Sequence, residues 1–574
     1  MKKKLLPALI VTGLIILVVI IMGITALINK YTPTKKTEDL KEYFNISSDD
    51  EAALIVNNEL SDYKAKIIDK KIYVDYKFVH DSLNSRFYWD ANENVLLYTT
   101  ASDIISAAAD SNSYSVTKQT NDFGYPIVKA TSDSALIALD YVKQYSNITF
   151  KSYDDPARIV ITSKWDEIDS ATVSKSTQVR VKGGIKSPIL KEVKKDDKIT
   201  ILDSGDKWDK VATEDGVIGY IKRKALSESK KTKLTNPDYE EETFTHIKKD
   251  KDICLAWNQV TSQSANSKVP QVISSTKGIN VMSPTWFYLN DNNGNLADIA
   301  SKDYVSYCHS QGIEVWGLFS NTDVDAAYVL THTSTRTTLI NQIMSAAFNY
   351  ELDGVNIDFE NITEAAYGDS YIEFIRELAI KCHNNGISLS VDVTVPASFN
   401  KFFNRSDMAN FADYIVIMGY DEHYKGSDAG SVSSIPWVTE GVESTLKEVP
   451  ADQIILGMPF YTRIWELTPK EDDDAVTDTE DQSKYTVASQ VYSMDAAAAQ
   501  LATNNATAAL DEESGQNYAE WSVSNKLYKV WLEDTTSLEK RLKLVDDNKL
   551  AGAAFWKLGF ENSSVWDTVI KYLN

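Results

Sequence analysis

Apolar and polar positions follow different patterns in successive parts of the chain. The first part, residues 5–29, contains no charged side chain and is almost wholly apolar. About 20 consecutive apolar residues are enough for a helix that crosses a bilayer. A cleaved signal peptide would have a shorter apolar core ending at small residues, and Ile24-Thr25-Ala26 fits such a site poorly. The pattern therefore predicts an uncleaved transmembrane helix, with a cleaved signal peptide as the alternative.

Lysine counting does not decide the orientation of this helix, because three lysines precede the span and three follow it closely. A short N-terminal tail is the easier end to retain in the cytoplasm, so we place the remainder of the chain outside. We expect a single-pass protein of the cell membrane. Residues 1–36 then form the cytoplasmic tail, the anchor and the start of a linker.

Residues 42–165 contain short stretches of alternating apolar and polar residues, which is typical of strands. From Tyr73 to Leu97 the pattern predicts a strand, a short helix and two more strands, and a similar series begins at Leu136. This repeat resembles the small α+β module at the N-terminus of copper amine oxidases. The resemblance implies no copper chemistry here, because His80 is the only histidine of the region.

Residues 169–227 alternate short β-type segments with glycine-containing turns, which predicts a small β-barrel. The series from Val179 to Lys222 resembles the bacterial Src-homology-3-like domain. That resemblance implies either cell-wall binding or a spacer role, and both stay open. A polar linker, residues 228–246, follows.

From residue 247 to 574, apolar stretches of strand length alternate with amphipathic segments of helix length. This alternation predicts a TIM (β/α)8 barrel with strands at 253–257, 278–282, 314–319, 354–359, 388–395, 414–418, 454–458 and 551–555. The interval before the last strand is too long for one helix and includes the acidic run 471–474, so we expect an inserted subdomain over the barrel mouth. The predicted fold class is a multidomain chain ending in this barrel.

Composition narrows the partners and chemistries. The net charge of −23 argues against a nucleic-acid partner and against electrostatic attraction to anionic lipid or wall polymer. The three cysteines have neither metal-site nor disulfide spacing, which predicts buried apolar residues. There is no HExxH motif to support a zinc hydrolase, and we expect no metal or organic cofactor.

The segment 352–361, Leu-Asp-Gly-Val-Asn-Ile-Asp-Phe-Glu-Asn, carries the candidate chemistry. Side chains alternate between the faces of a strand, so Asn356, Asp358 and Glu360 share the face opposite Val355 and Ile357. Polar groups inside a barrel are costly unless they pair or are used, and Glu360 falls at the strand end where barrel enzymes place catalysis. Neighbouring like charges raise a carboxyl pKa, which suits a general acid.

Two other interpretations of this cluster are open. It could be a structural hydrogen-bond network, or a magnesium or calcium site built from carboxylate and amide oxygens. No phosphate-cradling glycine loop accompanies the cluster, which weakens the metal interpretation.

The segment resembles the signature DxxDxDxE of glycoside hydrolase family 18, the chitinase and endo-β-N-acetylglucosaminidase family. Here the signature is Asp353, Asn356, Asp358 and Glu360, with asparagine in place of the middle aspartate. Two further family features follow in order, Met418-Gly419-Tyr420-Asp421 and a tryptophan, Trp556, at the last strand. The sequence around Tyr420 is closest to the spore-cortex and wall-lytic branch.

The resemblance implies roles for these residues. Glu360 would protonate the glycosidic oxygen, Asp358 would orient the substrate's acetamido group, and Tyr420 would donate to the acetamido oxygen. Substrate contacts would come from a further set: Asp353, Asn356, Met418, Asp421 and Trp556. Five other tryptophans are open as sugar platforms or as packing: Trp257, Trp286, Trp316, Trp465 and Trp531.

Together these features predict a glycosidase that cleaves β-1,4-linked N-acetylglucosamine glycans, either peptidoglycan or chitin-like, by substrate-assisted retaining catalysis. Its partners would be this polysaccharide, a membrane through the N-terminal helix, and cell wall through the Src-homology-3-like domain. The alternatives are a catalytically silent cell-surface glycan-binding protein on the same barrel, and a surface adhesion or scaffold protein in which the N-terminal modules matter most.

Overall fold

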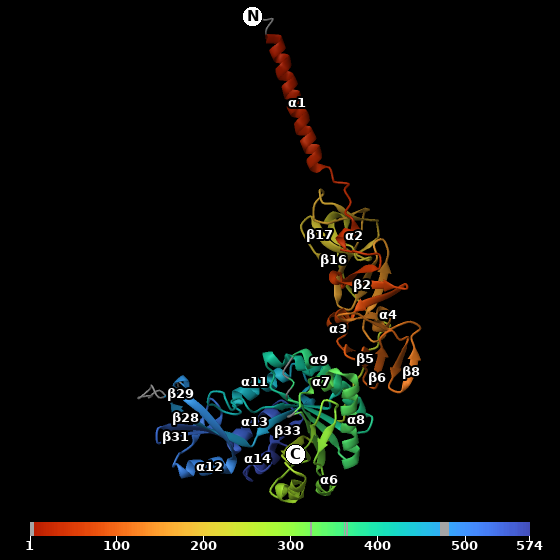
Figure 1. The fold of residues 1–574 in the computed structure, drawn as a ribbon. Helices are drawn as coiled ribbons and strands as arrows, with labels where there is room; N and C mark the ends of the chain where they lie inside the picture. The colour runs from red at the N-terminus through yellow and green to blue at the C-terminus, as the bar shows by residue number, and fades with distance from the viewer. Residues whose placement is uncertain (1–4, 322–323, 361, 363–364, 471–481, 574) are drawn as a thin grey trace. The chain divides into compact units, whose positions relative to one another are not determined.

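The computed structural model describes residues 5–321, 324–360, 362, 365–470 and 482–573 (Figure 1). The first element, α1 (Leu5–Tyr31), is a continuous helix, and its segment Pro7–Tyr31 is long and apolar enough to cross a membrane. A signal sequence near the N-terminus would have the same character. After this helix, contacts within the chain define two compact units, each described separately below.

The first unit contains two seven-stranded sheets. The order of the first is β11-β12-β1-β2-β3-β10-β9, and its strands are β1 (Glu51–Val56), β2 (Glu59–Ile68), β3 (Lys71–Asp75), β9 (Val128–Ala130), β10 (Ala135–Ala138), β11 (Thr149–Tyr153) and β12 (Arg158–Thr162). The order of the second is β15-β14-β18-β17-β16-β13-β19, with β13 (Glu167–Thr172), β14 (Thr177–Arg180), β15 (Ile189–Val193), β16 (Lys198–Asp203), β17 (Trp208–Thr213), β18 (Ile218–Lys222) and β19 (Lys230–Lys233).

These two sheets share one hydrophobic core. Phe44 and Ile55 from the N-terminal part pack with Val179, Val211 and Ile221 of the second sheet. The sheets are therefore joined by buried apolar contact.

The predicted repeat of strand, helix, strand and strand is present twice as element order. It occurs as β3, α3 (Tyr76–Ser82), β4 (Phe87–Asp90) and β5 (Val95–Thr99), and again as β10, α4 (Leu139–Gln144), β11 and β12. The two copies differ in where their last strands go. β11 and β12 join the first sheet, whereas β4 and β5 begin a separate sheet with β6 (Ile104–Ala108), β7 (Ser113–Val116) and β8 (Gln119–Asp122).

The second unit is built on a closed barrel of eight parallel strands. They are β20 (Ile253–Asn258), β21 (Val281–Leu289), β23 (Glu314–Ser320), β24 (Gly354–Asp358), β25 (Ser388–Thr394), β26 (Tyr414–Met418), β27 (Ile454–Pro459) and β33 (Gly552–Trp556). A short strand, β22 (Leu296–Asp298), pairs antiparallel with β21. The predicted strands are present, although the second lies at 281–289 and not at 278–282, because Gly278 has φ +78° and belongs to the preceding turn.

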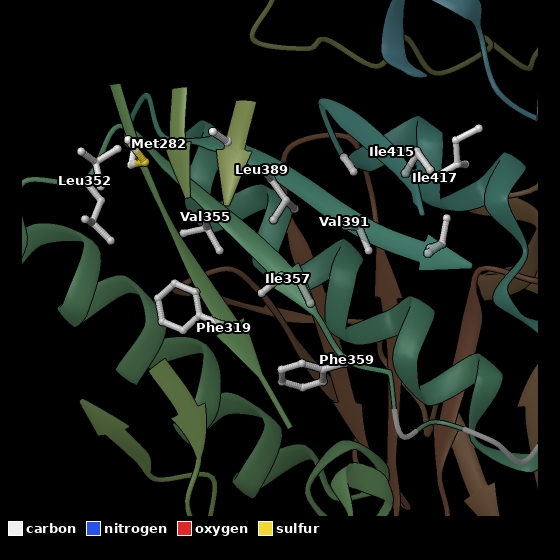
Figure 2. Close-up of a cluster of buried hydrophobic side chains, with 14 of the residues drawn as sticks. Met282, Phe319, Leu352, Val355, Ile357, Phe359, Leu389, Val391, Ile415 and Ile417 are labelled. Atoms are coloured by element: carbon white, nitrogen blue, oxygen red, sulfur yellow. The ribbon is translucent and has the colours of Figure 1, made fainter. Parts of the chain in front are cut away.

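Helices connect the barrel strands in chain order (Figure 1): α5 (Val269–Ile273), α6 (Lys302–Ser310), α7 (Ala326–Thr331), α8 (Thr333–Tyr350), α9 (Gly368–His383), α10 (Arg405–Phe411), α11 (Ile435–Thr445), α13 (Thr535–Asp547) and α14 (Val565–Tyr572). The outward side chains of the strands pack beneath them. Figure 2 shows Val355, Ile357 and Phe359 of the fourth strand on the side that faces helices. All three are buried, as the alternation predicts.

The expected insertion lies between β27 and β33. It is a five-stranded antiparallel sheet of order β29-β28-β32-β31-β30 together with the helix α12 (Met494–Thr503). Its strands are β28 (Tyr461–Pro469), β29 (Tyr485–Ser493), β30 (Ala509–Asp511), β31 (Gln516–Val523) and β32 (Lys526–Leu532). The acidic run 471–474 lies outside the described residues.

Part of the N-terminal region belongs to the same compact unit as the barrel. Residues 88–106 and 115–121 belong to the same compact unit as residues from 242 onward. Tyr88 donates to or accepts from Ser370 at 2.8 Å, and the Thr99 hydroxyl donates to Glu373 at 2.8 Å, so the β4–β5 hairpin contacts α9 directly. The compact unit of the barrel therefore includes residues from within the expected α+β module, 42–165.

Candidate active site

Asn356 lies at the centre of a hydrogen-bond network inside the barrel. Its side-chain oxygen accepts from the Trp257 indole at 3.0 Å and from the Ser283 hydroxyl at 2.9 Å. Its amide donates to Ser390 at 3.1 Å and to Asp392 at 2.7 Å. Asn356 is fully buried, and these four bonds use all of its donors and acceptors. The predicted inward direction of this side chain is confirmed.

Asp358 and Glu360 follow Asn356 on the same face, and their side chains are hydrogen-bonded to each other. Burial and the nearby charges of Asp392 and Glu360 raise the pKa of Asp358 well above its usual value. Burial and the charge of Asp421 raise the pKa of Glu360, while the hydrogen bond from Asp358 opposes that rise. This pair therefore retains a proton at a higher pH than two isolated carboxyls would.

Glu360 opens into a cleft at the carboxyl ends of the barrel strands. The cavity has a volume of about 350 Å³, and its lining residues include Glu360, Met418, Tyr420 and Asp421, all named from the sequence. Barrel enzymes place their active sites at this end, where several strands contribute side chains. The structure thus brings four of the predicted residues to one concave surface.

Tyr420 and Trp556 belong to the aromatic floor beside this cleft. Trp257 contacts both rings edge to face, with centroid distances of 6.4 Å to Tyr420 and 6.0 Å to Trp556. Burial raises the pKa of Tyr420 well above its usual value, and the charges of Asp392 and Asp358 add to the effect. Its hydroxyl therefore stays protonated and can donate a hydrogen bond.

Asp421 is held by two neighbours from the start of the insertion. The Tyr461 hydroxyl donates to it at 2.6 Å, and Arg463 lies 3.5 Å from the same oxygen. Glu422 also lines the cleft, and its carboxylate accepts hydrogen bonds from the backbone and hydroxyl of Ser434 at 2.7 and 2.9 Å. Asp421 is the acidic residue of this loop whose charge raises the pKa of Glu360.

Asp353 does not lie at this site. It precedes β24, at the opposite end of the strand from Glu360, and accepts hydrogen bonds from the Val315 backbone and from His309, both at 2.8 Å. Asp353 therefore links the starts of β23 and β24 by a hydrogen bond. It lies away from the cleft, contrary to the expectation that it contacts substrate.

The structure also places residues at the cleft that sequence reasoning did not single out. Asp392 of β25 is buried beside Asn356, and the cleft wall includes Phe399, Tyr424 and Trp437. Phe399 is 76% exposed and Tyr424 is 57% exposed, which is unusual for large aromatic side chains. By contrast, Trp257, Trp286, Trp316 and Trp465 are at most 1% exposed and serve as packing. Trp531 is partly buried in the core of the insertion.

The sequence predicts that the chain binds no metal and that its three cysteines are buried. Over the residues described, no group of three or more His, Cys, Asp and Glu side chains is arranged to hold a metal ion. Cys254, Cys308 and Cys382 are unpaired and buried, as predicted from their spacing.

A barrel with paired carboxyls beside a cleft is an arrangement that many glycoside hydrolases use. Residues 291–561 match the family model described as glycosyl hydrolases family 18.

The chain is also similar to curated proteins. An uncharacterized glycosylase, YvbX, of Bacillus subtilis (strain 168) is 24% identical over 303 residues, covering 49% of this chain and 81% of its own length. The cortical fragment-lytic enzyme of Bacillus subtilis (strain 168) is 25% identical over 235 residues, covering 40% of this chain and 51% of its own. The chain therefore spans about half the length of that second relative. Among solved structures, the C-terminal domain of a chitinase from Desulfitobacterium hafniense DCB-2 aligns with a TM-score of 0.49 at 19% identity, over 56% of this chain and 98% of that domain.

Proposed function

We propose that the barrel hydrolyses β-1,4-linked N-acetylglucosamine glycans by substrate-assisted, retaining catalysis, with Glu360 as the proton donor. The observation that carries this proposal is that Glu360 lies in one cleft with Tyr420 and Asp421, where its carboxyl interacts with that of Asp358. Such a pair retains a proton and would supply both an acid and a carboxylate to a bound sugar.

In the proposed first step, the carbonyl oxygen of the substrate's acetamido group attacks the anomeric carbon. Glu360 gives its proton to the glycosidic oxygen as that bond breaks. Asp358, now anionic, accepts a hydrogen bond from the acetamido N–H and stabilises the positive oxazolinium ion. Tyr420 donates to the acetamido oxygen, which fixes its direction of attack.

In the second step, the Glu360 carboxylate takes a proton from water, and the resulting hydroxide attacks the anomeric carbon from the side the leaving group vacated. The oxazolinium ring opens and the acetamido group is restored. Two inversions at the anomeric carbon give net retention. Trp556, Met418 and Asp421 serve as substrate contacts in this scheme, and the exposed rings of Phe399 and Tyr424 offer faces for further sugars.

The acetamido group itself provides the test. An oligomer of N-acetylglucosamine should be cleaved, and the same oligomer without its acetyl groups should not be, because it lacks the internal nucleophile. The first-formed product, followed by proton NMR, should be the β-anomer. Cleavage of the de-acetylated oligomer at a comparable rate, or an α-anomer formed first, would contradict substrate assistance.

The cellular substrate that we propose is peptidoglycan. The likeness to a cortical fragment-lytic enzyme supports this choice over chitin. The apolar α1 helix would anchor the protein in the cell membrane with the barrel outside, and the sheet of residues 169–227, as a Src-homology-3-like domain, would bind cell wall. Full-length protein should then stay with membranes after high-salt and carbonate washes, since apolar insertion is not screened by salt. Its release into the supernatant would indicate a cleaved signal sequence.

A further inference from the structure

The signature on β24 has lost a negative charge at its middle position, where Asn356 is neutral. A carboxylate is nevertheless present within hydrogen-bond distance. Asp392 lies on the adjacent strand β25 and accepts the Asn356 amide at 2.7 Å. It is only 5% exposed, so its charge interacts with its neighbours with little screening by water.

The strand register places Asp392 beside Asp358. In the parallel pairing of β24 with β25, Asn356 is opposite Ser390 and Ile357 is opposite Val391. The next residues in this register are Asp358 and Asp392, on strands about 4.8 Å apart. Both side chains point into the barrel, because they alternate with the outward residues Ile357 and Val391.

We propose that Asp392 supplies, from the neighbouring strand, the carboxylate that the signature lacks at Asn356, and that its charge keeps the catalytic proton on the Asp358–Glu360 pair. The proposal rests on the function proposed above. Asp392 acts through Asp358 and touches no reacting atom, so it is a positioning residue.

Hydrogen bonding decides which of the two aspartates carries the charge. Burial raises the pKa of Asp392, but the hydrogen bond from the Asn356 amide opposes this rise and favours the ionised form of Asp392. Asp358 Oδ1 is buried and, among the described residues, has no hydrogen-bond partner. Two neighbouring carboxyls in a buried site do not both ionise readily, so the charge resides on Asp392 and the proton on Asp358.

From Asp358 the proton can pass to Glu360. Asp358 is hydrogen-bonded to Glu360, so transfer along this bond yields a protonated Glu360 and an anionic Asp358. Glu360 then gives the proton to the glycosidic oxygen as positive charge develops next to Asp358. The remaining titratable groups near Asp392 are the hydroxyls of Tyr420 and Tyr371, and burial raises the pKa of both, so they stay neutral.

The test removes the negative charge of Asp392 by a substitution that keeps the shape of the side chain. Asp392→Asn keeps an oxygen that can accept from Asn356 but removes the charge, so the pair should lose its proton at lower pH. The basic limb of the kcat/KM profile should move to lower pH, with kcat/KM falling on the order of tenfold or more on its alkaline side. The reciprocal double variant Asn356→Asp/Asp392→Asn returns the carboxylate to β24 and should restore most of both properties.

Ser390→Ala is the matched control, since it also removes a hydrogen bond to Asn356 but changes no charge. It should leave the limb in place. A second readout needs no substrate: the carboxyl carbon-13 resonance of Asp358, identified by its loss in Asp358→Asn, should titrate at lower pH in Asp392→Asn. Unchanged titration and an unchanged limb in folded Asp392→Asn, or a double variant as impaired as the single one, would overturn the inference. Failure of the proposed function would instead appear as wild-type protein without activity on acetylated oligomers.

Discussion

Asp90 and Thr333 are 243 positions apart, yet one Asp90 oxygen accepts hydrogen bonds from both the backbone N–H and the hydroxyl of Thr333, each at 2.6 Å. Thr333 is the first residue of α8, whose N-cap residue His332 makes no side-chain cap bond. The next residue, Ser334, is capped by Glu93 from the same hairpin, its N–H donating at 3.0 Å. Two acidic residues of the β4–β5 hairpin thus stabilise the start of a barrel helix, where the helix dipole favours negative charge.

Removing this cap should weaken the barrel. Asp90 is 1% exposed, and Asp90→Ala leaves two part-buried donors of Thr333 without this acceptor. We expect a loss of about 1–3 kcal/mol in the free energy of unfolding, measured by urea denaturation. Asp62→Ala, which changes an exposed aspartate of β2, is the control and should be nearly neutral. Equal stability of the Asp90→Ala and Asp62→Ala variants would show that the hairpin contributes little.

The same contacts bear on how far the chain can be shortened. A chain beginning at Glu242 retains every barrel strand but loses the partners of Thr333, Ser370 and Glu373. We expect it to unfold at lower urea concentration than the full chain and to be less active on soluble oligomers at 37 °C. Identical denaturation midpoints for the barrel would contradict this expectation.

The pH dependence of catalysis should respond to Asp421. Its charge raises the pKa of Glu360, so Asp421→Asn should lower that pKa and let Glu360 lose its proton at lower pH. The basic limb of the kcat/KM profile therefore moves to lower pH. High salt should shift the wild-type limb in the same direction, because it screens this repulsion. A limb that stays fixed or moves upward in Asp421→Asn would contradict the assigned interaction.

The exposed cleft aromatics should affect binding more than chemistry. Phe399→Ala removes a ring face at the cleft wall, and KM for long oligomers should rise several-fold while kcat changes little, because this apolar ring carries no group that can transfer a proton. Phe348→Ala removes a ring of similar exposure, 56%, from α8 outside the cleft and should leave KM unchanged. A fall confined to kcat would place Phe399 in the chemistry instead.

The direction of each side chain on β24 was predictable because successive side chains of a strand point to opposite faces. The odd positions Val355, Ile357 and Phe359 pack outward and the even positions Asn356 and Asp358 point inward, as strand geometry requires. The same rule would have excluded Asp353, whose odd parity and position before the strand separate it from the site. Its inclusion came from the family signature alone.

Asp392 was not predicted because its partner depends on the register between β24 and β25, which neither strand encodes by itself. A signal was nevertheless present, since Ser388, Ser390 and Asp392 alternate with Leu389 and Val391 and so share the inward face. Phe399 and Tyr424 lie outside the barrel strands, in a short 3-10 helix and a connecting loop, where no periodicity indicates direction. Likewise, the attachment of the β4–β5 hairpin to α8 is a long-range contact that a local pattern cannot predict.

The central claim, that Glu360 is the proton donor, is tested most directly by comparing Glu360→Gln with Glu351→Gln. Both variants replace a glutamate by its uncharged isostere, but Glu351 is exposed and precedes β24 at the end of the strand away from the cleft. Initial rates on an N-acetylglucosamine oligomer should fall about 10²–10⁴-fold for Glu360→Gln and stay at the wild-type value for Glu351→Gln. Binding of the oligomer, measured by calorimetry, should persist in both variants. Hydrolysis at the wild-type rate by folded Glu360→Gln would contradict the claim.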